Sequence, residues 1–85
     1  TYLDTFGWIL YLQGKALEAK PFFKHAMLYG GKDSAVIMDH YAEVLYALKD
    51  YDLAFVYWYR AQAKNGGEIP DLDERIAARK KAIGK

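Results

Sequence analysis

The chain has 85 residues, of which 53% are hydrophobic and 16% aromatic, so it is too apolar to be disordered. Its length predicts one folded domain of modest stability. Its net charge of +1 favours neither nucleic acid nor an anionic membrane surface as a partner. Without cysteine it forms no disulfides or thiolate metal sites, and without an apolar run of roughly 18 residues it is not expected to insert into a membrane, although neither feature identifies the compartment.

The sequence repeats itself with a period of 35 residues. A shift by this period aligns six identical pairs, which are Asp4 with Asp39, Leu10 with Leu45, Tyr11 with Tyr46, Ala19 with Ala54, Ala26 with Ala61, and Gly31 with Gly66. A fixed period of this length indicates stacked copies of one supersecondary unit. We assign the two copies to about 1–34 and 35–69 and a closing helix to about 70–84, so that 1–85 forms a single domain.

The first helix of each unit carries a stripe of apolar residues. They recur at i, i+3, i+4 and i+7, which predicts that one face of the helix belongs to the core. In the first copy they are Leu3, Phe6, Gly7 and Leu10, and in the second copy they are Met38, Tyr41, Ala42 and Leu45. The first of these helices is expected to end near Gly14, which suits a C-terminal cap, and the other near Asp50, which suits the start of the next helix. Such short turns force each unit into an antiparallel hairpin.

The second helices are expected from about 16 to 29 and from about 51 to 65. The later one carries a face of small and aromatic residues, which are Tyr51, Ala54, Phe55, Trp58, Ala61 and Gln62. Small alanines beside large rings allow two helices to approach closely. Pro21 lies inside the earlier helix, where it removes one backbone hydrogen bond and predicts a local kink without a break.

Clusters of helix-breaking residues at 30–34 and 66–70 separate the two hairpins and the closing helix. Asp33 or Ser34 suits the N-cap of the helix that follows, and Pro70 suits the first position of the closing helix. The apolar side of the closing helix consists of Leu72, Ile76 and Ile83. Acidic residues in its first turn and basic residues near its end complement the helix dipole.

This unit, an antiparallel helix pair with small residues at its close contacts, resembles the tetratricopeptide repeat. The small residues are Gly7 and Ala42 in the first helices, and Ala19, Ala26, Ala54 and Ala61 in the second. Two departures lie in the turns, where Gly31 and Gly66 replace the family's usual proline and one extra residue lengthens the unit. The resemblance covers residues 1 to about 67. It implies an all-α protein, an α-solenoid of antiparallel helix hairpins with about five helices.

For function, the resemblance implies a concave groove, lined by the first helices, that holds a peptide or a partner helix. Six residues, called the groove stripe below, are expected to face it: Asp4, Trp8, Tyr11, Asp39, Glu43 and Tyr46. None of them is Lys, Arg or Asn, with which some family members grip a terminal carboxylate. Acidic and aromatic groups suit a protein or peptide that carries basic and apolar residues. The competing interpretation is ordinary helix surface, or contact with a neighbouring repeat.

A second apolar strip is expected on the outer side of the fourth helix, and we call Leu53, Val56 and Tyr59 the outer strip. It either packs under the closing helix or is exposed, in which case it favours a homodimer. Nothing in the sequence covers Leu3 and Phe6, which predicts a fragment of a longer array with a further repeat upstream. Cytoplasmic and exported locations then both stay open. The alternative function is a structural spacer, or a self-associating terminal segment without a ligand of its own.

The sequence contains no catalytic, cofactor-binding or metal-ligating pattern, so we expect no enzyme, no cofactor and no metal. His25 and His40 lie on different helices without a matching motif and are expected to be surface or capped histidines. The basic end of the closing helix is expected to be a solvated tail, formed by Arg79, Lys80 and Lys81. The RNA-binding pentatricopeptide repeat is similar in length, but the neutral chain and the acidic groove stripe disfavour it, so no nucleic acid is expected.

Overall fold

The computed structural model describes residues 2–30, 34–65, 67 and 69–84, and this part of the chain is all-helical. It contains five helices, α1 (Tyr2–Leu12), α2 (Ala16–Leu28), α3 (Ala35–Ala47), α4 (Tyr51–Asn65) and α5 (Leu72–Ala82). The sequence-based prediction of an all-α protein with about five helices is therefore confirmed. The expected turn residues Gly31 and Gly66 and the alternative cap Asp33 lie outside the described residues.

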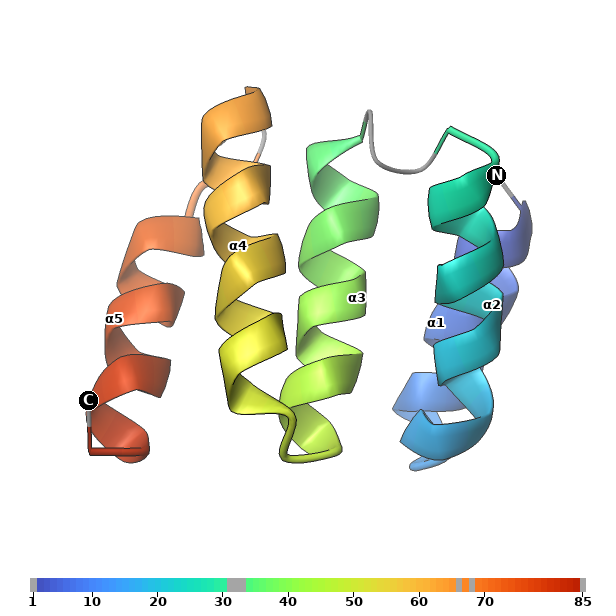
Figure 1. The fold of residues 1–85 in the computed structure, drawn as a ribbon, viewed down its shortest axis with the longest axis horizontal. Helices are drawn as coiled ribbons and strands as arrows, with labels where there is room; N and C mark the ends of the chain where they lie inside the picture. Colours follow the sequence, from blue (N-terminus) through green and yellow to red (C-terminus); the bar gives the residue numbers. More distant parts are fainter. Residues whose placement is uncertain (1, 31–33, 66, 68, 85) are drawn as a thin grey trace.

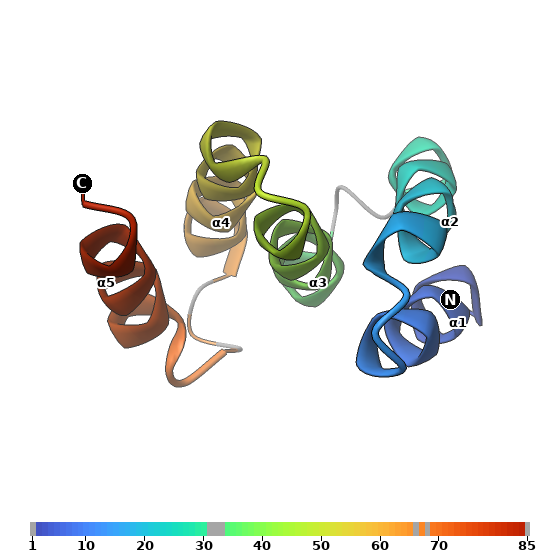
Figure 2. The same cartoon turned by 90° about the horizontal axis from the view of Figure 1, so that it is seen from below.

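The helices pack in chain order, with consecutive helices in contact and running in opposite directions (Figure 1). Helix α1 also touches α3. Seen along the helix axes, α1 and α3 lie on one side of the molecule, α2 and α4 lie on the other, and α5 follows beside α4 (Figure 2). The first helices of the two units therefore share one face, which is where the groove stripe is expected.

The ends of the helices follow the local residues closely. Gly14 has a φ of +81°, the left-handed conformation that glycine adopts at a helix C-terminus, and Lys49 takes the same role after α3 with a φ of +67°. The Ser34 hydroxyl accepts a hydrogen bond from the backbone N–H of Ile37 at 3.3 Å, so the predicted N-cap is confirmed. Helix α2 continues through Pro21, as expected.

The predicted start of the closing helix is wrong by two residues. Helix α5 begins at Leu72, and Pro70 lies in the turn before it. The backbone N–H of Leu72 donates to the carbonyl of Ile69 at 3.1 Å, so the turn that contains Pro70 is closed by its own hydrogen bond. Proline serves here as a turn residue with a fixed φ.

The core is centred on the second hairpin and its contacts with α2. Phe23 and its repeat equivalent Trp58 have no exposed surface, and they are the two largest fully buried side chains. The small positions of the repeat are also buried, namely Ala19, Ala26, Ala42, Ala54 and Ala61. Small residues in these places let the helices approach the large rings, as the repeat pattern indicates.

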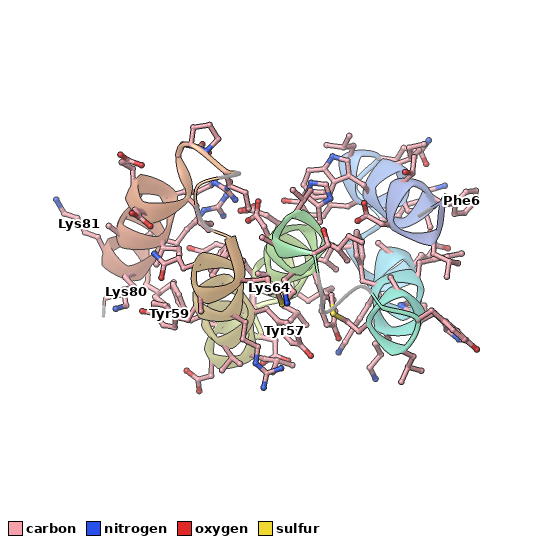
Figure 3. The ribbon with its side chains drawn as sticks, turned by 90° about the horizontal axis from the view of Figure 1, so that it is seen from above. Phe6, Tyr57, Tyr59, Lys64, Lys80 and Lys81 are labelled. Carbon is pink, nitrogen blue, oxygen red and sulfur yellow. The ribbon has the colours of Figure 1, made fainter. Side chains whose placement is uncertain are left out.

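Phe6 corrects the predicted core stripe, because its side chain is 51% exposed. Its equivalent Tyr41 is buried between two rings, Phe23 of α2 at 6.1 Å and Tyr57 of α4 at 4.7 Å between centroids. The ring contact of Phe6 is with Phe22 on one side, at 5.0 Å, and Figure 3 shows Phe6 pointing outward at the α1 end of the molecule. The same repeat position therefore differs in burial between the two copies.

Gly7 allows α1 to lie close against α2. A Cβ built at this position would be 2.9 Å from Cε2 of Phe23, a fully buried ring that has little room to move. We expect Gly7→Ala to lower the free energy of unfolding by about 1 kcal/mol, because an overpacking cost of about 1–3 kcal/mol exceeds the gain of about 1 kcal/mol in helix propensity.

Urea denaturation followed by circular dichroism measures this change. The matched control is Ala42→Gly at the equivalent position of the second copy, where the Cβ is accommodated and its removal should also destabilise. If Gly7→Ala unfolded at a higher urea concentration than the natural chain, the close contact would be refuted.

Candidate functional site

In the structure, the residues of the groove stripe form one network together with four side chains that the sequence does not assign to this face. The six residues of the stripe come from α1 and α3, and they meet His40 of α3, Trp58 of α4, and Arg75 and Arg79 of α5. The site divides into two halves, one around Trp8 and one around Asp39 and Glu43, with Tyr11 between them.

In the first half, Trp8 is stacked between two flat side chains. The rings of Trp8 and His40 are 3.9 Å apart with an angle of 12°, and the rings of Trp8 and Tyr11 are 4.8 Å apart with an angle of 20°. His40 Nδ1 lies 3.2 Å from Oδ1 of Asp4. The sequence predicts a surface or capped histidine at this position, and the structure instead places His40 as the link between Asp4 and the aromatic stack. These side chains are partly accessible to solvent.

In the second half, two carboxylates are buried under α5. Asp39 and Glu43 are each 6% exposed. Arg75 binds Asp39 with both terminal nitrogens, at 2.6 Å from Nη1 to Oδ1 and 3.0 Å from Nη2 to Oδ2, and Nη1 lies 3.2 Å from Glu43. The indole N–H of Trp58 donates to Oδ1 of Asp39 at 2.8 Å. Both oxygens of Asp39 are therefore satisfied within the chain.

Arg79 corrects the prediction of a solvated basic tail. Its Nη2 donates to both oxygens of Glu43, at 3.2 and 3.0 Å, and its guanidinium lies over the Tyr46 ring at 4.6 Å from the centroid. These two contacts combine charge pairing with a cation–π interaction. Lys80 and Lys81 are exposed, as expected for the other two residues of that segment.

Two residues of the site, Arg75 and Tyr11, have shifted pKa values. The hydrogen bond to Asp39 raises the pKa of Arg75 above its usual value, although burial opposes the shift. Burial raises the pKa of Tyr11, and the negative charge of Glu43 adds to this, whereas the positive charge of Arg79 opposes it. The Tyr11 hydroxyl interacts electrostatically with Glu43, so Tyr11 connects the aromatic half of the site to the ion-pair half.

The raised pKa of Tyr11 predicts how stability changes at high pH. Below pH 10.0, the ordinary pKa, the hydroxyl is neutral in both the folded and the unfolded chain. As the pH rises through this value, the unfolded chain loses the proton first, which favours unfolding until the folded pKa is passed. We expect the Tm of the natural chain to fall more steeply between pH 10 and 11 than that of Tyr11→Phe, measured by thermal melts. Parallel curves would contradict the shift.

The two halves repeat one contact. His40 of the second unit reaches back to Asp4 of the first, and Arg75 of α5 reaches back to Asp39, in each case across 36 residues. Asp4 and Asp39 are 35 residues apart, and so are His40 and Arg75. Helix α5 therefore makes the contact that the first helix of a third unit would make. A further shift of the sequence by the same period, which aligns α5 with α3, would have found Arg75.

The outer strip lies away from this site. Leu53, Val56 and Tyr59 are 37%, 41% and 41% exposed, so α5 does not cover them fully. The Lys80 ammonium lies over the Tyr59 ring at 5.2 Å from the centroid, and Figure 3 shows these two side chains next to each other. Self-association through this strip stays a prediction.

An open hollow of about 530 Å³ lies on a different part of the surface, lined by Pro21, Lys24, His25, Met27, Leu28, Tyr41 and Tyr57. It contains no residue of the groove stripe. Among the described residues, no group of three His, Asp or Glu side chains is arranged to hold a metal ion.

Within the described part of the chain, no helix combines the length and the apolar character needed to cross a bilayer. Comparison with protein-family models, with curated proteins and with solved structures gave no match.

Proposed function

We propose that the chain is a protein-interaction module of the tetratricopeptide-repeat type, an α-solenoid of two hairpins closed by α5. In this proposal, the face shared by α1 and α3 is a concave groove that holds a peptide or a partner helix. The repeated sequence pattern and the equivalent contacts of His40 with Asp4 and of Arg75 with Asp39 support the repeat architecture.

The observation that carries the binding function is the aromatic stack of Trp8, His40 and Tyr11. Large rings that are partly accessible and held in a fixed geometry provide contact area at a low cost in conformational entropy, which is why Trp and Tyr are common in binding hot spots. Asp4 lies beside the stack, 3.2 Å from His40, and is partly accessible, so it gives the stack an acidic neighbour. A partner with apolar and basic side chains fits this combination.

We propose a binding role rather than catalysis for the same groups. The acidic side chains of the site are engaged with other side chains, Asp4 with His40, Asp39 with Arg75 and Glu43 with Arg79. Acid–base chemistry needs a titratable group within reach of a substrate proton. Ion pairs that join α1 to α3 and α3 to α5 fix the shape of the site.

The test is selection of peptides from a random display library on the immobilised chain. Selected peptides should bind Trp8→Ala at least 10-fold more weakly than the natural chain, because the central ring of the stack is lost. The matched control is Val56→Ala on the outer strip, which should bind them unchanged. Peptides that all tolerated Trp8→Ala but lost affinity for Val56→Ala would refute the groove assignment.

The second candidate function is self-association, with the protein acting as a spacer or terminal segment. It is favoured by the partial exposure of the outer strip. Light scattering at increasing protein concentration decides it, since a monomer at millimolar concentration would exclude a dimer through this strip.

A further inference from the structure

We infer that α5 occupies part of the binding groove as a built-in ligand, and that the external partner is an amphipathic helix carrying two arginines four residues apart, which competes with α5. This inference rests on the proposed function and specifies the partner. It is based on the contacts between α5 and the rest of the chain.

The buried contacts of helix α5 lie on a single stripe, whereas Asp73 and Lys80 touch Gln62 and Tyr59 at its exposed margins. Leu72 and Ile76 are 1% and 4% exposed, and Arg75 and Arg79 make the ion pairs with Asp39 and Glu43. These four residues stand at i, i+3, i+4 and i+7, the spacing by which an amphipathic helix lies in the groove of a partner protein. The other residues of α5 are exposed. The pattern apolar-x-x-Arg-apolar-x-x-Arg is therefore what this end of the groove recognises.

The contacts are specific for arginine. Two parallel hydrogen bonds to the two oxygens of Asp39 need the planar fork of a guanidinium, which a lysine ammonium does not have. The second guanidinium lies over the Tyr46 ring and also pairs with Glu43, so it makes a cation–π contact and an ion pair together. Both carboxylates are buried, so a bound helix without the arginines would leave them without a counter-charge.

Because α5 belongs to the same chain, its occupation of the groove lowers the affinity for an external helix. A tethered helix is present at a high effective concentration, so an external helix binds only to the fraction of molecules in which α5 has opened. Weakening the hold of α5 should therefore strengthen the binding of an external helix. A helix that serves only as a fixed cap would show no such competition.

The experiment uses the full isotope-labelled chain and an unlabelled synthetic peptide with the sequence of residues 70–84. Excess peptide should displace α5, so that the amide hydrogens of Arg75 to Arg79 in the chain exchange with solvent at least 10-fold faster. The amides of α3 and α4 should keep their rates. The control peptide has both arginines replaced by alanine and should leave all rates unchanged.

A second measurement weakens α5 itself. The labelled peptide should bind the Leu72→Ala variant of the full chain at least 10-fold more tightly than the natural chain, by fluorescence anisotropy. The matched control is Glu18→Gln, an exposed position on α2, which should bind it like the natural chain.

Unchanged exchange of the α5 amides at saturating peptide would overturn the inference, and so would equal displacement by the control peptide. The exchange measurement decides even if Leu72→Ala does not fold, because it uses the natural chain. The inference also fails separately from the proposed function if library peptides depend on Trp8 but lack paired arginines and leave α5 in place. If no peptide depends on Trp8, both proposals fail.

Discussion

Replacement of Trp58 by alanine is expected to lower the free energy of unfolding by about 3–5 kcal/mol. Trp58 is the largest fully buried side chain, so the substitution leaves a cavity at the centre of the core. It also removes the indole N–H that donates to Asp39 at 2.8 Å. A domain of this size has a stability of roughly 4–13 kcal/mol, so the loss is a large fraction of the total.

Urea denaturation monitored by circular dichroism measures the change, and the natural Trp8 remains as a fluorescent probe. Trp58→Phe is the matched control, because it keeps most of the ring volume but not the N–H group. It should cost about 1–2 kcal/mol, mainly through the lost hydrogen bond. If Trp58→Ala were no more destabilising than Trp58→Phe, the ring would not be at the centre of the core.

Replacement of Asp39 by alanine is expected to cost about 3–5 kcal/mol, the usual effect of removing one partner from a buried ion pair. Asp39 accepts two hydrogen bonds from Arg75 and one from Trp58. Without it, Trp58 Nε1 loses its acceptor and Arg75 keeps only its longer contacts, with Glu43 at 3.2 Å and with the exposed Asp71 at 3.6 Å. The effect should be seen both in overall stability and in the docking of α5.

The repeat offers a matched control for Asp39. Asp4 occupies the equivalent position in the first copy and contacts His40 at 3.2 Å, in a more accessible place. Asp4→Ala should therefore cost only about 1 kcal/mol. A double-mutant cycle of Asp39→Ala with Arg75→Ala should show a coupling of at least 1 kcal/mol. A coupling near zero, or equal losses for Asp4→Ala and Asp39→Ala, would contradict the ion-pair network.

The helices and most of the core could be predicted because their signals are local. The apolar period, the helix-breaking residues and the cap at Ser34 each depend on residues that are close in sequence. The two copies of the repeat also support each other's assignment. The buried residues Phe23 and Trp58 occupy one repeat position, and both are fully buried. Such agreement between two copies is stronger than either pattern alone.

The misassigned residues depend on packing between units. Phe6 has the same place in its helix as Tyr41, yet Phe6 is exposed and Tyr41 is buried. Burial at this position depends on which neighbouring helices pack against it. The burial of Asp39 and Glu43 depends on the register of α5, which a wheel drawn for α3 alone does not contain. The partner of Arg79 is 36 residues away in the sequence, so the charge pattern of the closing helix alone predicts a solvated tail.

Binding of a partner along the groove stripe is the central claim, and chemical-shift mapping tests it most directly. The isotope-labelled chain is titrated with a peptide selected from the display library, and its backbone and indole resonances are followed. The largest shifts should fall on α1 and α3, with the Trp8 indole N–H among them. Shifts that gathered on the outer strip of α4, with Trp8 unaffected, would contradict the claim.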